Sequence, residues 1–190
     1  MATEILLIRH SSLKVPRGFC YGFYDMDVSE NFTNEVEQLQ HQIAYFNPEK
    51  VYCSTLKRCT KMADILYPNT YVTDERLKEL NYGDWENKEW KDINVPEKEN
   101  WIYTYPHLKT PNGESFSDLK LRVEDFFNHL QNQPHQKVAI VCHGGVIRSF
   151  ISSLLQIPLD ISQNFKIHYA GHVVLKFDEH KWKIFELQNI

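Results

Sequence analysis

The run Ile5-Leu6-Leu7-Ile8-Arg9-His10 decides the fold, because four consecutive apolar residues end abruptly on two basic side chains. A short apolar run of this kind is typical of a strand buried on both faces of a parallel sheet. Three further runs have a similar length and β-branched content: Val51–Cys53, Tyr71–Thr73 and Val138–Cys142. We therefore expect four strands in one largely parallel sheet.

Longer segments between these strands carry apolar residues at helical spacing: Thr33–Phe46, Leu56–Leu66, Ser115–Leu130 and Val146–Leu155. A proline follows shortly after each of them, as is common beyond the end of a helix. The alternation of strands and helices predicts an α/β fold with three layers, α/β/α, around a mostly parallel central sheet.

The last part of the chain predicts an antiparallel addition to this sheet. Val173–Phe177 and Trp182–Leu187 flank a polar stretch, which indicates a hairpin at the C-terminal edge with Asp178-Glu179-His180 as its turn. Asn87–Pro111 is rich in Trp, Lys, Glu and Pro and has weak periodicity, so we expect an irregular helical lid or substrate loop there.

Composition excludes several classes of function. The chain has 190 residues, which fits one domain over residues 1–190, and 42% of them are hydrophobic. A net charge of -4 gives no basic surface for nucleic acid. No apolar stretch approaches the roughly 20 residues of a membrane span. The four cysteines form neither a zinc spacing nor a disulfide framework, so the cytoplasm is the expected location.

The chemistry-bearing residues follow the predicted strands. Ligands of open α/β sheets bind beyond the carboxyl ends of the strands. The first strand runs into Arg9-His10, the second into Ser54–Arg58, and the fourth into His143-Gly144-Gly145, which opens a helix. Guanidinium groups and a helix N-terminus both bind phosphate well. A neutral histidine can attack phosphorus, and Glu79, after the third strand, is the best-placed proton donor.

These segments together resemble the histidine phosphatase (phosphoglycerate mutase-like) superfamily, and the resemblance covers nearly the whole chain. The matching elements are Arg9-His10, Gly22–Asp25, Ser54-Thr55-Leu56-Lys57-Arg58, the Leu77–Glu86 segment, Asn112–Ser115 with Arg122, and His143–Arg148. Within the superfamily, Arg9–Leu13 together with Pro16–Asp25 looks most like α-ribazole phosphatases.

The resemblance implies a role for each matching residue. His10 is the expected nucleophile and Glu79 the acid and then the base, while Arg9, Arg58 and His143 form the phosphate pocket. It further implies hydrolysis of a small phosphomonoester such as α-ribazole 5′-phosphate, with no metal and no cofactor. Cys20, Tyr21 and Gly22 are candidate substrate contacts. Arg122 and Arg148 fit a role at this site and a place on a helix surface equally well.

Three other functions compete with this hypothesis. Cys142–Ser149 also fits the Cys-x-x-Gly-x-x-Arg-Ser/Thr loop of cysteine-dependent phosphatases, although Val141 replaces the histidine expected before the cysteine. A phosphoglycerate mutase-type transferase would use the same residues with a bisphosphorylated primer. A non-catalytic phosphoester-binding module is expected to lose the nucleophile or the acid first, and both His10 and Glu79 are present.

Overall fold

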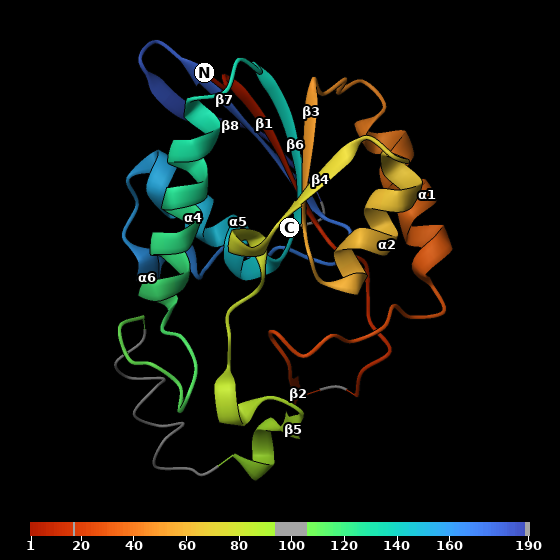
Figure 1. Ribbon diagram of the computed structural model, residues 1–190, viewed down its shortest axis with the longest axis vertical. Helices are drawn as coiled ribbons and strands as arrows, with labels where there is room; N and C mark the ends of the chain where they lie inside the picture. The colour runs from red at the N-terminus through yellow and green to blue at the C-terminus, as the bar shows by residue number, and fades with distance from the viewer. Residues whose placement is uncertain (17, 94–105, 189–190) are drawn as a thin grey trace.

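The computed structural model describes residues 1–16, 18–93 and 106–188. Its centre is a six-stranded sheet in the order β4-β3-β6-β1-β7-β8 (Figure 1). The bounds of these strands are β1 Glu4–Arg9, β3 Lys50–Ser54, β4 Tyr71–Asp74, β6 Lys137–Cys142, β7 His172–Asp178 and β8 Lys181–Gln188. Strands β1, β3, β4 and β6 pair with one another in parallel. Strand β7 pairs antiparallel with β1, and β8 pairs antiparallel with β7, as the sequence predicts.

Helices cover both faces of this sheet. On one face lie α1 (Phe32–Ile43) and α2 (Lys57–Leu66), and on the other lie α4 (Phe116–Gln131), α5 (Gly144–Leu155) and the short α6 (Leu159–Ser162) (Figure 1). The predicted three-layer α/β/α fold is therefore confirmed. The first of these helices ends three residues before the predicted Phe46, and α5 begins two residues before the predicted Val146.

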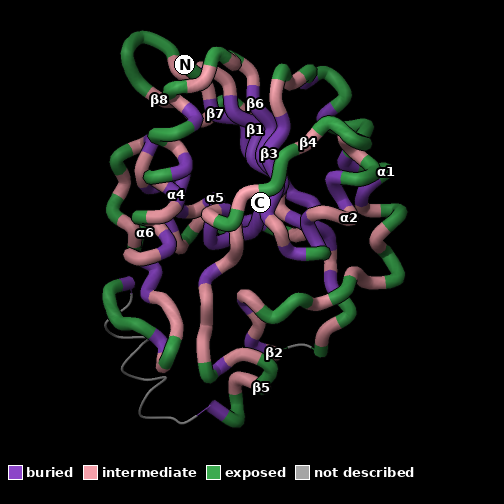
Figure 2. The backbone as a smooth tube through the Cα atoms, in the orientation of Figure 1, coloured by how far each residue is buried: buried purple, intermediate pink, exposed green. Residues whose placement is uncertain are grey.

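The alternation of side chains along β1 explains why both faces need a cover. Ile5 and Leu7 point into a core shared with α4 and α5. Leu6 and Ile8 point into a second core shared with α1 and α2. All four side chains are fully buried, and the central strands β1, β3 and β6 are mostly buried, whereas the edge strands β4 and β8 are partly exposed (Figure 2). An unbroken apolar run is what a strand with two covered faces requires.

The closing hairpin forms as predicted, with a shorter turn. Asp178 pairs with Lys181 at the end of the ladder, so the turn is Glu179-His180 alone and Asp178 belongs to the strand. Both turn residues have positive φ, 50° and 64°, as a two-residue type I′ turn demands.

The loops that follow the parallel strands gather beyond the carboxyl edge of the sheet (Figure 1). They contain a two-stranded sheet of β2 (Phe19–Cys20) and β5 (Lys88–Glu89), and the short 3₁₀ helices η1 (Glu75–Leu77), η2 (Gly83–Trp85) and η3 (Trp90–Asp92). Of the predicted lid, Asn87–Pro111, residues 94–105 lie outside the described residues. Within the part of the chain that the structure describes, no helix has the length and apolar character needed to cross a membrane.

Candidate active site

The register of the sheet brings the residues that follow β1 and β6 side by side. Arg9 pairs with Cys142, so the next residue on each strand, His10 and His143, stands at the same edge. Their ring centroids lie 5.1 Å apart. Ser54 ends the neighbouring strand β3 and reaches His143 through its hydroxyl, 2.8 Å from Nε2. The predicted convergence at the carboxyl edge of the sheet is therefore present.

His10 is a buried imidazole with a defined tautomer. Its Nδ1 lies 2.7 Å from the carbonyl oxygen of Ser11. Because a carbonyl only accepts hydrogen bonds, Nδ1 must carry the proton, and in the neutral ring Nε2 keeps its lone pair. Burial, followed by the positive charges of Arg58 and Arg9, holds the pKa of His10 well below its usual value of 6.5. The ring is thus neutral at pH 7 and can act as a nucleophile through Nε2.

Arg9 places a cation beside this ring. One of its terminal nitrogens donates to the carbonyl oxygen of Ile167, and the guanidinium lies 4.2 Å from the ring centroid of Tyr169. Its Nε is buried and has no hydrogen-bond partner among the described residues. A buried N–H of a cation that faces no acceptor is unusual, and an anion satisfies it well.

Arg58, in the first turn of α2, is completely buried beneath the site. Its terminal nitrogens donate to the carbonyl oxygens of Gly22 (2.6 Å) and Tyr24 (3.1 Å), and its Nε donates to Nδ1 of His143 (3.3 Å). Three of its five N–H groups are therefore engaged with the protein. Arg58 adjoins both histidines and stabilises their neutral forms electrostatically.

These contacts also explain the Gly22–Asp25 element. A Cβ on Gly22 would lie 1.9 Å from the carbonyl oxygen of Leu80, so only glycine allows this close approach. The Asp25 carboxylate accepts from the backbone N–H of Lys57, at 2.9 Å, and so caps the start of α2. The Gly22–Asp25 element thus holds Arg58 in two ways: its carbonyl oxygens accept from the guanidinium, and Asp25 fixes the start of the helix that carries Arg58.

The His143 ring is also neutral, and both of its nitrogens are hydrogen-bonded to protein groups. Burial, then the charge of Arg58, holds its pKa well below 6.5. Since Arg58 can only donate to Nδ1, Nε2 carries the proton and donates to Ser54. Both ring nitrogens contact protein groups in this structure, so the predicted phosphate contact of His143 stays a prediction.

Glu79 stands opposite the histidines at the N-terminus of α5. Its Oε2 accepts from the backbone N–H of Gly145 (3.2 Å), and its Oε1 accepts from that of Leu80 (3.0 Å). A Cβ on Gly145 would lie 2.2 Å from Oε1 of Glu79, so the glycine makes room for the carboxylate.

The acidic residues close to Glu79 in sequence have other roles. Glu75 pairs with Lys78, and the Asp84 carboxylate accepts from Asn112. Glu86 accepts from the backbone N–H groups of Phe23, Tyr24 and Tyr82. Of these four acidic residues, Glu79 is the one that lines the cavity of this site.

A cavity of about 180 Å³ lies beside these groups, lined by Arg9 and Glu79, while His10, Arg58 and His143 are buried next to it and are not among its lining residues. Its walls carry two arginines, one carboxylate and several aromatic rings: Arg9, Phe19, Cys20, Tyr21, Glu79, Tyr82, Trp90, Gly144 and Arg148. Cys20 and Tyr21 line the cavity, whereas Gly22 does not and lies against the backbone of Leu80; the predicted substrate contacts of all three stay predictions. A larger cavity of about 620 Å³ between α4 and α6 contains none of the predicted catalytic or phosphate-binding residues.

Several residues at this site were not predicted from the sequence. Phe19 reaches the cavity because β2 pairs with β5, beside Trp90, which belongs to the predicted lid or substrate loop. Tyr169 contacts Arg9 and lies 5.6 Å from the His10 ring, and its hydroxyl is 2.6 Å from that of Tyr21. No strand or helix pattern surrounds Tyr169 in the sequence, so no signal pointed to it.

Cys142, the rival nucleophile, is completely buried in the core formed with α4 and α5. Burial raises the pKa of its thiol well above the usual value, so the thiolate needed for attack is suppressed. The side chain belongs to β6 rather than to a phosphate-binding loop. The geometry therefore favours His10 as the nucleophile. Among the described residues, no group of three or more His, Cys, Asp or Glu side chains is arranged to hold a metal ion.

Comparison with known proteins shows the family of this chain. The family model of the histidine phosphatase superfamily (branch 1) matches residues 5–190. An adenosylcobalamin/α-ribazole phosphatase of Escherichia coli is 29% identical over 172 residues, which cover 86% of this chain and 85% of that protein. Phosphoserine phosphatase 1 of Hydrogenobacter thermophilus is 23% identical over 97% of this chain and 91% of its own length.

Solved structures share the fold. The α-ribazole phosphatase of Shigella flexneri superposes with a TM-score of 0.88 at 22% identity, over 98% of this chain and 96% of that one. A phosphoserine phosphatase of Entamoeba histolytica in complex with 3-phosphoglyceric acid gives a TM-score of 0.84 at 20% identity, over 99% of this chain and 98% of that one.

Proposed function

Because this chain belongs to the histidine phosphatase superfamily, branch 1, we propose that it hydrolyses a small phosphomonoester through a phosphohistidine formed on His10. The observation that carries the proposal is the hydrogen bond from Nδ1 of His10 to Ser11, which leaves Nε2 of a buried, neutral ring free to attack. Arg9, with its buried and unpaired Nε, supplies a cationic donor for the phosphate.

The reaction proceeds in two displacements. In the first, Nε2 of His10 forms a bond to phosphorus, the ester P–O bond breaks, and Glu79 gives its proton to the leaving oxygen. In the second, water attacks the phosphohistidine, Glu79 takes a proton from that water, and inorganic phosphate leaves with His10 restored. Arg9, Arg58 and His143 stabilise the transferring group, and the N-terminus of α5 adds a favourable dipole.

As substrate we propose α-ribazole 5′-phosphate. Support comes from the α-ribazole phosphatase at 29% identity and from the matching residues around Arg9–Leu13 and Pro16–Asp25. A screen of α-ribazole 5′-phosphate, phosphoserine, 3-phosphoglycerate and p-nitrophenyl phosphate tests it. We expect the highest kcat/KM for α-ribazole 5′-phosphate, with activity that persists in excess chelator. Dependence on a bisphosphorylated primer would instead identify a mutase.

The nucleophile is tested by trapping the intermediate. Rapid quench with a radiolabelled substrate should give protein-bound label that survives base, is lost in acid and maps to His10. The label should be absent in His10→Ala, whereas Cys142→Ser should still form it and turn over. Label on Cys142, or an active His10→Ala protein, would overturn the proposal.

A further inference from the structure

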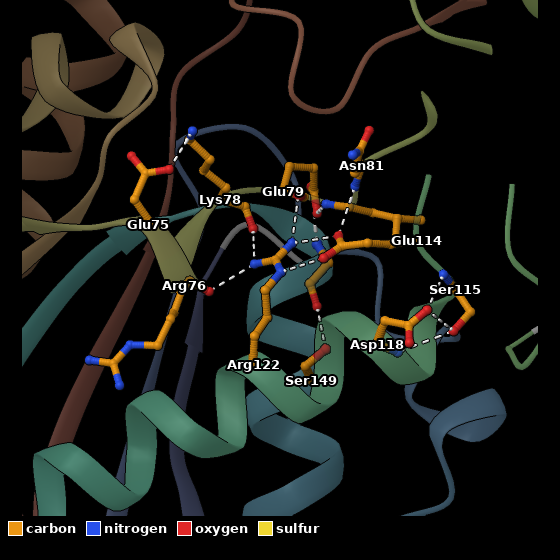
Figure 3. Close-up of polar contacts among 12 residues, drawn as sticks. Glu75, Arg76, Lys78, Glu79, Asn81, Glu114, Ser115, Asp118, Arg122 and Ser149 are labelled. Atoms are coloured by element: carbon orange, nitrogen blue, oxygen red, sulfur yellow. Dashed lines mark hydrogen bonds and ion pairs between the residues drawn. The ribbon is translucent and has the colours of Figure 1, made fainter. Parts of the chain in front are cut away.

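Arg122 lies two turns into α4 and uses all five of its N–H groups in hydrogen bonds. Nε and one terminal nitrogen donate to the two oxygens of Glu114, each at 2.9 Å. The remaining three N–H groups donate to the carbonyl oxygens of Arg76 (2.8 Å), Lys78 (2.6 Å) and Glu79 (2.7 Å). In Figure 3 the guanidinium lies between the Glu114 carboxylate and the backbone that carries Glu79.

Glu114 continues this contact on the far side of Glu79. Its carboxylate accepts from the backbone N–H of Asn81 (3.0 Å), and its own backbone N–H donates to the Asn81 carbonyl oxygen (2.8 Å). The hydroxyl of Thr110 donates to the same carbonyl oxygen, at 3.2 Å. Hydrogen bonds thus hold the backbone at Lys78, at Glu79 itself and at Asn81, from one residue before the acid to two residues after it.

The helix that carries Arg122 is itself anchored beside Glu114. Ser115 is the N-cap of α4, and its hydroxyl and the Asp118 carboxylate form a complete capping box. Leu119 and Val123 bury the same helix in the core. The capping box and the core contacts of α4 therefore fix the position of Arg122. Through its hydrogen bonds, Arg122 in turn fixes the position of the Glu79 backbone.

The Arg122–Glu114 pair is not an ordinary surface ion pair. The side chains are only 17% and 21% exposed, and exposed pairs contribute little because water screens them. Three of the five N–H groups of Arg122 donate to carbonyl oxygens of one backbone segment, residues 76–79, rather than to a charged group. The carboxylate of Glu79 then extends from this fixed backbone to the Gly145 amide and the cavity.

We propose that Arg122, clamped by Glu114, is the positioning residue for Glu79: it fixes the backbone from which the proton donor reaches the leaving oxygen. The proposal rests on the acid role of Glu79 in the proposed function. Lysine cannot replace Arg122, because it has three donors around one point and lacks the planar fork that spans a carboxylate and three carbonyl groups.

The test compares alkyl with aryl phosphates, because only a poor leaving group needs the proton. Glu79→Gln should lower kcat/KM for alkyl esters by about 10²–10⁴-fold and leave aryl esters almost unchanged. Arg122→Lys and Glu114→Gln should show the same signature at about 10–10²-fold, since a misplacement of about 1 Å costs up to about 10²-fold in rate.

The matched control is Lys120→Met, which removes a basic residue and its ion pair with Glu124 from the same helix, away from the site. It should leave the ratio of alkyl to aryl kcat/KM unchanged. Circular dichroism and thermal unfolding establish that each variant is folded. Glu114→Gln keeps the guanidinium and so provides a second probe should Arg122→Lys fail to fold.

A double variant separates this inference from the proposed function. If Arg122 acts through Glu79, the alkyl-ester losses of Glu79→Gln and Arg122→Lys should not multiply in the combined protein. Multiplying losses, or folded Arg122→Lys and Glu114→Gln proteins that lose alkyl and aryl activity equally, would overturn the positioning role. A Glu79→Gln protein without leaving-group dependence would instead refute the acid role itself.

Discussion

At the scale of single residues, the site depends on how the protein controls protons on two histidines. Burial, and after it the positive charge of the adjoining Arg58, lowers the pKa of both His10 and His143 and keeps both rings neutral. Their tautomers are opposite: Ser11 holds the proton of His10 on Nδ1, and Ser54 holds that of His143 on Nε2. The His10 ring therefore keeps a lone pair on Nε2, whereas both nitrogens of His143 are hydrogen-bonded within the protein.

Nitrogen-15 NMR of the histidine side chains tests this arrangement. Because the pKa of His10 lies well below 6.5, its ring should remain the neutral Nδ1–H tautomer as the pH falls through 6.5 and titrate only at lower pH. The His10→Gln variant identifies its signals. A His10 ring that gains a proton at or above pH 6.5 would contradict the proposed nucleophile.

At the scale of elements, the N-terminus of α5 binds the Glu79 carboxylate and, in the proposed mechanism, also faces the phosphate. His143 is its N-cap, and the next two residues are glycines whose requirements differ. A Cβ at Gly144 would meet Arg148 at 3.5 Å, which is an ordinary contact. A Cβ at Gly145 would lie 2.2 Å from Glu79 and 3.0 Å from Leu119, so one of them must move.

This difference predicts unequal effects of two neighbouring substitutions. Gly145→Ala should displace the Glu79 carboxylate and lower kcat/KM for alkyl phosphates by about 10²-fold, the cost of misplacing a catalytic group by about 1 Å. Gly144→Ala should lower kcat/KM for the same esters clearly less, because its added Cβ makes only an ordinary contact. The measurement is kcat/KM on one alkyl and one aryl ester for both variants. Equal losses for the two substitutions would show that the tight contact with Glu79 is unimportant.

At the scale of the whole molecule, the buried histidines couple stability to pH. His10, His143 and His172 all have pKa values below 6.5 in the folded protein. The unfolded chain therefore binds protons first as the pH falls. Stability should be fully present well above the ordinary histidine pKa of about 6.5, where the rings are neutral in both the folded and the unfolded protein, and should decline as the pH falls through 6.5 toward the folded pKa values.

Urea unfolding between pH 8 and pH 5 measures this decline. We expect a nearly constant free energy of unfolding above about pH 7 and a fall below about 6.5. The free energy of unfolding should fall less steeply with decreasing pH in His143→Gln, because that variant lacks one of the buried titrating rings. Carboxylates such as Asp74 and Glu186 have lowered pKa values, so the stability that they contribute is lost only as the pH falls below their ordinary values of 3.8 and 4.5, outside this range. A stability that rises between pH 7 and pH 5.5 would be incompatible with neutral buried histidines.

Much of the molecule was determined by the sequence alone. The apolar runs at Ile5–Ile8, Val51–Cys53 and Val138–Cys142 predict the parallel strands, because a strand covered on both faces has no polar positions. Arg9-His10, Ser54–Arg58 and His143 follow those strands directly, so the topology of the sheet is enough to place them at one edge.

Only the tertiary structure decided how those residues are used. The occupied nitrogens of Arg58 and the separation of Glu79 from its acidic neighbours depend on partners far away in the chain. The tautomer of His10 depends on the orientation of its ring toward the carbonyl oxygen of Ser11, which the folded backbone sets. Tyr169 and Trp90 reach the site from segments without periodicity. Arg122 matches three carbonyl groups that lie more than forty residues before it. Backbone acceptors leave no mark on the side-chain sequence, so such a contact is visible only once the chain is folded.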